Sequence, residues 1–208
     1  MYTSISGDEL NIFQKPARVI IAGSSGAGKS YFVSALISKY RQVFTKVIVI
    51  GSDLENCNNL NITRDDSYDP LNDDENGNSP KLIIFDDIIY NKSHMKLAAE
   101  CFIRGRHKNI SLLFLTQNIF LSDKDYRIIA LNATHVGLFR SRDLRQIQYF
   151  GKTFLCDNQI SEFIKLYKKK IVNIQYGYLF IDFTKSCDSP LMIRSNVTGN
   201  EYEHAFLL

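Results

Sequence analysis

The feature that most constrains the fold is a glycine-rich run that follows a short apolar segment. Residues 17–22 (ARVIIA) are β-branched at their centre, which predicts a buried strand that stops at Gly23. From Lys29 to about Tyr40, apolar residues recur at spacings of three and four, which predicts a helix. The run between them matches the pattern G-x-x-x-x-G-K-[ST] in Gly23, Ser24, Ser25, Gly26, Ala27, Gly28, Lys29 and Ser30. Pattern and context together predict a phosphate-binding loop.

The residue types in this run suit nucleotide phosphates. Glycines let the backbone wrap an anion without Cβ clashes, and successive N–H groups then face it at the start of a helix. We expect Lys29 to reach the β- and γ-phosphates and Ser30 to hold Mg²⁺. The expected cofactors are therefore ATP and Mg²⁺, and the expected nucleotide-binding residues run from Gly23 through Tyr31.

A pair of carboxylates follows a second apolar run, at residues 82–87 (LIIFDD). Four apolar residues and then an acid are typical of the strand that carries the metal-binding aspartate of this class of site. Asp86 is predicted to hold Mg²⁺, and Asp87 to polarise the attacking water. The alternative is a strand that simply ends in a turn, and the phosphate-binding loop makes that the weaker interpretation.

Polar residues also follow the apolar run at 110–116 (ISLLFLT), where Gln117 and Asn118 come next. A glutamine or asparagine at such a strand end can orient the water that attacks the γ-phosphate. Asparagine is also a common turn residue, which gives a plainer explanation. By position, Gln117 is the predicted sensor of the γ-phosphate.

Two basic clusters have several possible roles. Arg104 and Arg106 precede the run at 110–116, and Arg142 follows an apolar run at 134–139. An arginine from a neighbouring subunit could neutralise charge in the transition state, and either cluster could contact DNA phosphates. Solvated arginines at helix ends are the third reading. We expect at least one functional arginine among the three.

Apolar runs that alternate with helix-like segments predict an α/β fold. Further buried strands are expected at 45–50 and 134–139, and helices at about 93–102, 123–131, 143–150 and 157–167. The expected fold is a three-layer P-loop NTPase with a mainly parallel central sheet, helices on both faces and antiparallel edge strands at about 174–183 and 191–194. Residues 1–208 are predicted to form one domain, with a long acidic loop at 51–80 that could include a short strand at Leu60–Thr63.

The charge of the chain is unevenly distributed. Residues 53–80 contain eight acidic residues and one arginine, for a charge of −7, so the rest of the chain carries +10 of the total of +3. A basic bulk suits a polyanionic partner, although a solvated surface with an acidic loop explains it equally well. The start of the sequence lacks a signal-peptide pattern, and no apolar stretch approaches the ~20 residues that span a membrane.

Residues 102–118 (FIRGRHKNISLLFLTQN) resemble the genome-packaging ATPases of poxvirus-like and other double-jelly-roll DNA viruses, virophages and Polinton-type elements. Residues 176–182 (YGYLFID) and 193–196 (IRSN) are similar to the last part of such proteins, and the resemblance extends from about residue 15 to 198. These proteins belong to the FtsK–HerA branch of P-loop NTPases. Asp87 stands where many of them have glutamate.

The resemblance implies an ASCE core of the RecA type, in which the strand carrying Gln117 lies between the P-loop strand and the strand carrying Asp86. It implies a DNA translocase that forms a homo-oligomeric ring, a pentamer or hexamer, and moves double-stranded DNA into a viral capsid. The implied partners are double-stranded DNA and capsid or portal-vertex proteins, and the implied location is the host cytoplasm, a viral factory or the virion. Two rival functions remain on the same fold: a small-molecule kinase and a nucleotide-dependent assembly switch.

Overall fold

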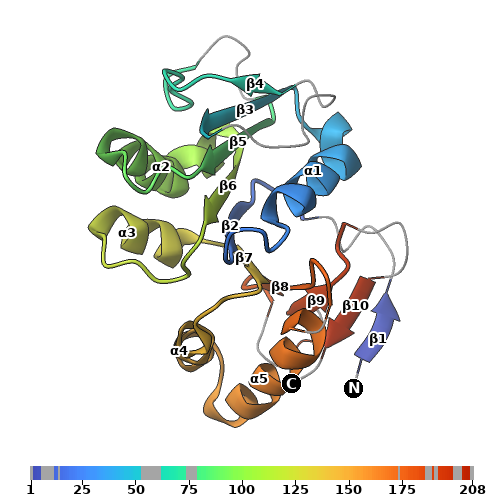
Figure 1. Cartoon of the computed structure of the whole chain (residues 1–208). Helices are drawn as coiled ribbons and strands as arrows, with labels where there is room; N and C mark the ends of the chain where they lie inside the picture. The colour runs from blue at the N-terminus through green and yellow to red at the C-terminus, as the bar shows by residue number, and fades with distance from the viewer. Residues whose placement is uncertain are drawn as a thin grey trace.

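The structure, a computed structural model, describes residues 2–5, 12–13, 15–52, 62–73, 79–172, 174–185, 189, 192–198 and 203–206. Within this part of the chain the strands form one ten-stranded sheet (Figure 1). Its order is β1-β10-β9-β8-β7-β2-β6-β5-β3-β4. The strands are β1 (Tyr2–Ile5), β2 (Arg18–Ala22), β3 (Lys46–Gly51), β4 (Thr63–Arg64), β5 (Lys81–Asp86), β6 (Ile110–Thr116), β7 (His135–Phe139), β8 (Tyr178–Asp182), β9 (Ile193–Ser195) and β10 (Glu203–Phe206).

The sheet has a parallel part and an antiparallel part. The strands β7, β2, β6, β5, β3 and β4 pair in parallel, and β8, β9, β10 and β1 continue from β7 as antiparallel neighbours. The strand β6 lies between β2 and β5, as expected from the resemblance. Because the carboxyl ends of parallel strands meet at one edge, this order brings the ends of β2, β3, β5 and β6 together.

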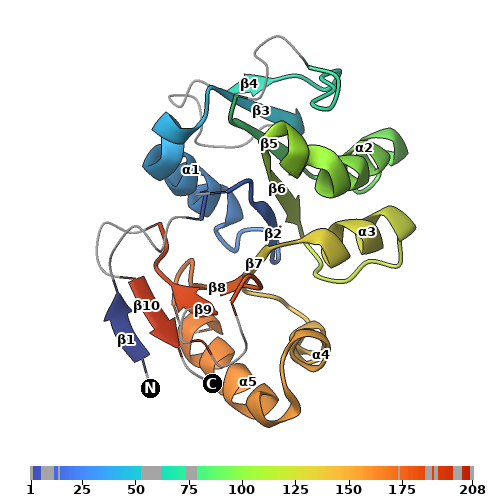
Figure 2. The same ribbon diagram turned by 180° about the vertical axis from the view of Figure 1, so that it is seen from behind.

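Helices cover both faces of the sheet (Figures 1 and 2). One face packs against α1 (Lys29–Tyr40), and the other against α2 (Lys92–Arg104), α3 (Lys124–Asn132), α4 (Leu144–Phe154) and α5 (Ile160–Tyr167). Successive strand residues point to opposite faces, so Ile83 and Phe85 face the α2 side while Leu82 and Ile84 face α1. This pattern confirms the α/β fold with a parallel sheet buried on both sides.

Several boundaries differ from the expected ones. The short strand considered at Leu60–Thr63 in the acidic segment is Thr63–Arg64, which pairs with β3 as β4. Residues 53–61 and 74–78 of that segment lie outside the described residues. The helix α2 spans Lys92–Arg104 where a helix was predicted at about 93–102, and the Asn91 side chain caps it by accepting from the Ser93 and His94 N–H groups. The segment predicted as a helix at 157–167 begins with a short 3-10 helix, Asp157–Gln159, and α5 follows directly.

Among the residues that the structure describes, no helix combines the length and the apolar character needed to cross a bilayer.

Candidate nucleotide-binding site

The glycine-rich run forms the turn between β2 and α1, as predicted. Gly26 and Gly28 have φ angles of 73° and 98°, in the left-handed region that side chains with a Cβ atom rarely adopt. Two backbone contacts fix the loop against neighbouring strands. The Gly23 N–H donates to the Thr116 carbonyl oxygen (3.1 Å), and the Ser24 N–H donates to the Arg140 carbonyl oxygen (2.9 Å). The loop is thereby clamped between the ends of β6 and β7.

The Lys29 ammonium lies at the centre of this loop. Its Nζ donates to the carbonyl oxygens of Gly23 (2.7 Å) and Ser24 (3.3 Å), which holds the side chain over the turn. Burial lowers the pKa of Lys29, and the carboxylates of Asp86 and Asp87 oppose that shift. A half-buried cation beside two acids is ready to bind an anionic phosphate.

The two carboxylates end β5, on the other side of Lys29. Asp86 is the last strand residue and is partly buried, whereas Asp87 is exposed. Successive side chains of a strand point to opposite faces, but Asp87 has a left-handed φ of 50° and both residues line one pocket. Burial and the charge of Asp87 raise the pKa of Asp86 to about 6, with Lys29 opposing.

The loop after β6 places Gln117 at the same pocket. The Thr116 hydroxyl donates to the Asn118 carbonyl oxygen (2.9 Å) and accepts from the Asn118 N–H (3.2 Å), so the chain turns tightly there. From α4, the Gln146 amide accepts from the Ile119 N–H and donates to Asn118 Oδ1, both at 3.2 Å. Gln117 is exposed between these fixed points and is free to contact a ligand.

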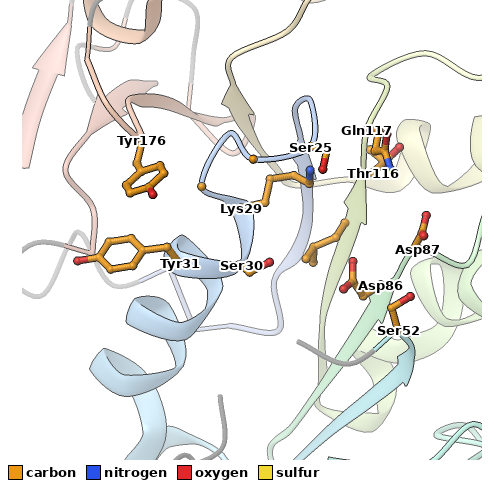
Figure 3. Close-up of a pocket in the computed structure, with 13 residues that line it drawn as sticks. Ser25, Lys29, Ser30, Tyr31, Ser52, Asp86, Asp87, Thr116, Gln117 and Tyr176 are labelled. Carbon is orange, nitrogen blue, oxygen red and sulfur yellow. The ribbon is translucent and has the colours of Figure 1, made fainter. Parts of the chain in front are cut away.

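These elements enclose a pocket of about 420 Å³ at the carboxyl edge of the parallel strands (Figure 3). Its lining residues are Ser25, Gly26, Gly28, Lys29, Ser30, Tyr31, Ser52, Asp86, Asp87, Leu115, Thr116, Gln117 and Tyr176. The sequence-predicted residues Gly23, Ser24 and Ala27 belong to the same loop but do not line the pocket. The structure therefore brings the predicted phosphate, metal and water-orienting groups together.

Magnesium is the metal that the fold implies, and the residues present fit it. Ser30 and Asp86 supply a hydroxyl and a carboxylate to one pocket, and oxygen is the ligand atom that Mg²⁺ prefers. Mg²⁺ commonly uses one or two protein oxygens and completes its shell with phosphates and water. The two protein ligands offered here, Ser30 and Asp86, match that coordination pattern.

Four pocket residues were not predicted from the sequence as site residues: Ser52, Leu115, Thr116 and Tyr176. Ser52 directly follows β3, and its N–H donates to the Asp86 carbonyl oxygen (3.0 Å), which ties it to the carboxylate pair. Its position after an apolar strand was the signal that could have identified it. Tyr176 comes from the turn before β8, and its local sequence contains no indication that it lies at the phosphate-binding loop.

The predicted arginines lie in different places. Arg104 and Arg106 stand at the end of α2 and in the 3-10 turn that leads into the start of β6, at the opposite edge of the sheet from the pocket. Arg106 is close enough to Arg18, the first residue of β2, to lower the pKa of Arg18 after the larger effect of burial. The pocket of this chain contains neither arginine, so a role for them in hydrolysis requires the site of a neighbouring copy.

Arg142 lies at the same edge of the sheet as the pocket. Its N–H donates to the Ser24 hydroxyl oxygen (3.1 Å), which joins the segment after β7 to the phosphate-binding loop. Its side chain is exposed and does not line the pocket. A functional role for at least one of the three arginines stays a prediction.

Comparisons with known proteins agree with this arrangement. No family model matches the chain. An uncharacterized protein, V3, of Sputnik virophage is 29% identical over 180 residues, covering 78% of this chain and 73% of its own length. The genome packaging NTPase B204 of Sulfolobus turreted icosahedral virus 2, solved with AMP, superimposes with a TM-score of 0.61 at 16% identity over 86% of this chain and 96% of that one.

The same B204 protein in complex with ATP-gammaS gives a TM-score of 0.58 at 16% identity, over 86% of this chain and 96% of B204. The expected resemblance to viral packaging ATPases is confirmed at the level of the fold by the structures of a packaging NTPase, and the sequence is similar to that of a virophage protein. This chain therefore has the α/β fold of a viral genome-packaging NTPase.

Proposed function

We propose that this chain is a Mg²⁺-dependent ATPase of the FtsK–HerA type that moves double-stranded DNA into a viral capsid. The observation that carries the proposal is the convergence of Lys29, the Asp86–Asp87 pair and Gln117 in one pocket of a packaging-NTPase fold. Each group comes from a different strand end, and together they supply what γ-phosphate hydrolysis needs: anion binding, metal binding and a positioned water.

We assign a role to each group from its position in the pocket. The loop N–H groups and Lys29 bind the phosphates, and Ser30 and Asp86 hold the Mg²⁺ that neutralises phosphate charge when bound. Asp87 accepts a hydrogen bond from the attacking water and takes its proton as the bond to the γ-phosphorus forms. Gln117, exposed at the pocket, orients the same water. The bond between the γ-phosphorus and the β–γ bridging oxygen then breaks, which releases ADP and phosphate.

A ring of identical chains, each a single ATPase domain, accounts for the remaining features. The pocket of one chain contains no arginine side chain among its described lining residues, and the exposed Arg104, Arg106 and Arg142 are available to a neighbouring site. A basic bulk suits contact with the phosphates of DNA, which carry no sequence information. A pentamer or hexamer acting with a capsid or portal-vertex protein is the assembly we propose.

The test is ATP hydrolysis by the purified protein, with and without double-stranded DNA, for wild type, Lys29→Ala and Asp87→Asn. We expect DNA to raise turnover and each substitution to lower it by at least a hundredfold. The control variants Lys152→Ala and Asp157→Asn alter exposed residues outside the pocket and should hydrolyse ATP like wild type. A wild type that binds ATP but never hydrolyses it, even when assembled with DNA, would identify a nucleotide-dependent switch instead.

A further inference from the structure

Two tyrosines form a stacked pair at one end of the pocket. The rings of Tyr31 and Tyr176 lie with centroids 5.7 Å apart and planes inclined by 25°. Both line the pocket, yet 63% of Tyr31 and 48% of Tyr176 remain exposed. They come from distant parts of the chain, Tyr31 from the first turn of α1 and Tyr176 from the turn before β8. Exposed apolar surface that gathers at a pocket can mark a place where a ligand binds.

The pair lies at the end of the pocket away from the hydrolytic groups. In Figure 3 the tyrosines are on one side of Lys29, and Asp86, Asp87 and Gln117 are on the other. The γ-phosphate of a nucleotide must face Asp87 and Gln117, with Lys29 at the phosphates. The remaining direction, toward Tyr31 and Tyr176, is therefore the one in which the nucleoside extends.

The backbone holds Tyr176 in place at some energetic cost. Tyr176 has a φ of 57°, a left-handed conformation that a bulky residue seldom adopts. Its ring packs against Gly28, where a Cβ atom would come within 2.7 Å of Tyr176 Cδ1. The next residue, Gly177, donates its N–H to the Ile174 carbonyl oxygen (3.1 Å), which closes the turn. Strain maintained at a ligand pocket indicates a functional constraint on this side chain.

We infer that Tyr31 and Tyr176 form a platform on which the nucleobase stacks. The inference rests on the proposed nucleotide binding, and it assigns the part of the site that recognises the base. The base lies against the open face of the pair while Lys29 and the loop bind the phosphates. A gap of 5.7 Å between centroids is too small for a third ring, so the base covers the pair and does not separate it.

The test compares two ligands that share the phosphates and differ in the base. Affinities for ATP and for inorganic tripolyphosphate, both with Mg²⁺, are measured by calorimetry for wild type, Tyr176→Leu, Tyr176→Phe and Tyr31→Ala. We expect Tyr176→Leu and Tyr31→Ala to weaken ATP roughly tenfold, as loss of a stacking ring does for single bases, and to leave tripolyphosphate within twofold. Tyr176→Phe keeps the ring and should bind ATP like wild type.

A spectroscopic signal provides a second measurement that does not depend on turnover. The fluorescence of 2-aminopurine riboside triphosphate should fall on binding to wild type and to Tyr176→Phe, because stacking quenches the base, and should recover in Tyr176→Leu. The control Tyr90→Ala removes a tyrosine that is 93% exposed and lines no part of the pocket, and it should change neither affinity nor fluorescence.

Two results would overturn the inference. If Tyr176→Leu weakens ATP and tripolyphosphate equally, the ring only supports the phosphate-binding loop through Gly28. If ATP affinity and quenching are unchanged in both Tyr176→Leu and Tyr31→Ala, the base binds elsewhere. Neither measurement requires hydrolysis, so a protein that binds nucleotide without turnover would contradict the proposed function and leave the stacking test intact.

Discussion

Burial and the neighbouring charge of Asp87 raise the pKa of Asp86 to about 6, and Lys29 offsets only part of this rise. The ionised Asp86 carboxylate is therefore less favourable in the folded chain than in the unfolded one. In the metal-free protein the contribution of Asp86 to the free energy of unfolding falls as pH increases from about 4 to about 6. Above pH 6 the folded chain bears the full cost of a charge that metal binding requires.

Replacing this carboxylate should stabilise the metal-free protein. We expect Asp86→Asn to unfold at a higher temperature than wild type at pH 8 in a chelating buffer, because the amide has no buried charge. At about pH 3, Asp86 is protonated in both the folded and the unfolded chain, so the two proteins should differ little. Thermal denaturation at both pH values checks this, and the same variant should have lost ATP hydrolysis. A variant that is less stable than wild type at pH 8 contradicts the raised pKa.

The site residues that could be predicted from the sequence have neighbours in the chain that explain them. Lys29 and Ser30 are fixed by the glycine pattern around them, and Asp86 and Gln117 by the apolar runs they follow. Tyr176 could not be placed in this way, because its contact with Gly28 joins residues nearly 150 positions apart and depends on a strained turn. Ser52 is an intermediate case. The strand before it was predicted, but the pairing of that strand with β5, which brings Ser52 to Asp86, was not.

At the scale of elements, α4 contacts the loop beside the pocket, and the sequence of the helix does not predict this contact. The Gln146 side chain bonds to both Asn118 and Ile119, directly after Gln117. The cap of this helix, Asp143, follows Arg142, whose N–H bonds to the phosphate-binding loop. One helix start thus contacts both segments that flank the γ-phosphate side of the pocket.

Removing the Gln146 contacts should disturb the loop that carries Gln117. We expect Gln146→Leu to lower kcat for ATP roughly tenfold, because two hydrogen bonds of about 1 kcal/mol each hold the segment directly after Gln117. The KM for ATP should change little, since Lys29 and its loop are untouched. The matched control is Gln148→Leu, an exposed position on the same helix. Steady-state kinetics decide the matter, and an increase in KM with kcat unchanged would place Gln146 in binding instead.

Element boundaries were predictable where a strand or helix is buried and long. The strands β2, β3, β5, β6 and β7 lie within a residue of the predicted runs, because parallel strands covered on both faces are apolar throughout. The boundaries of the antiparallel strands at the edge of the sheet could not be predicted in this way. A strand was expected at 174–183, but residues 174–177 form the turn that presents Tyr176 and β8 starts at Tyr178. The short strands β1 and β10 have too few residues to show a period.

At the scale of the whole molecule, a buried charge cluster joins the parallel and antiparallel parts of the sheet. Asp182 on β8 lies opposite His135 on β7, with Oδ1 3.4 Å from His135 Nε2, and its Oδ2 is 3.9 Å from an Arg194 nitrogen on β9. Burial alone would raise the pKa of Asp182, but the hydrogen bond and charge of His135 and the hydrogen bonds of Thr184 outweigh it and set the pKa at about 2.

The sign of this shift gives a stability prediction. Because the pKa of Asp182 is lower in the folded chain, its carboxylate stabilises the fold above pH 4, and this contribution is lost as pH falls toward 2. We expect Asp182→Asn to lower the free energy of unfolding by about 2 to 3 kcal/mol at pH 7, because it removes the carboxylate that faces His135 and Arg194. Denaturant unfolding from pH 7 to pH 2 measures it, and the difference from wild type should shrink in acid.

The control for this prediction is Asp157→Asn, an exposed aspartate outside the sheet, which should unfold like wild type at every pH. A constant difference between Asp182→Asn and wild type from pH 7 to pH 2 would show that the asparagine acts through packing and not through charge.

The pairing of β1 with β10, at one edge of the sheet, determines how this edge responds to a mechanical load. The strand β1 pairs with β10 so that Tyr2 is opposite Phe206 and Ile5 is opposite Glu203, which puts the first and last described residues at the same end of the pair. A force that pulls these two residues apart therefore unzips the pair one hydrogen bond at a time, and does not shear all its bonds together. The edge of the sheet yields at low tension, while β2, β5 and β6 keep their register around the nucleotide pocket.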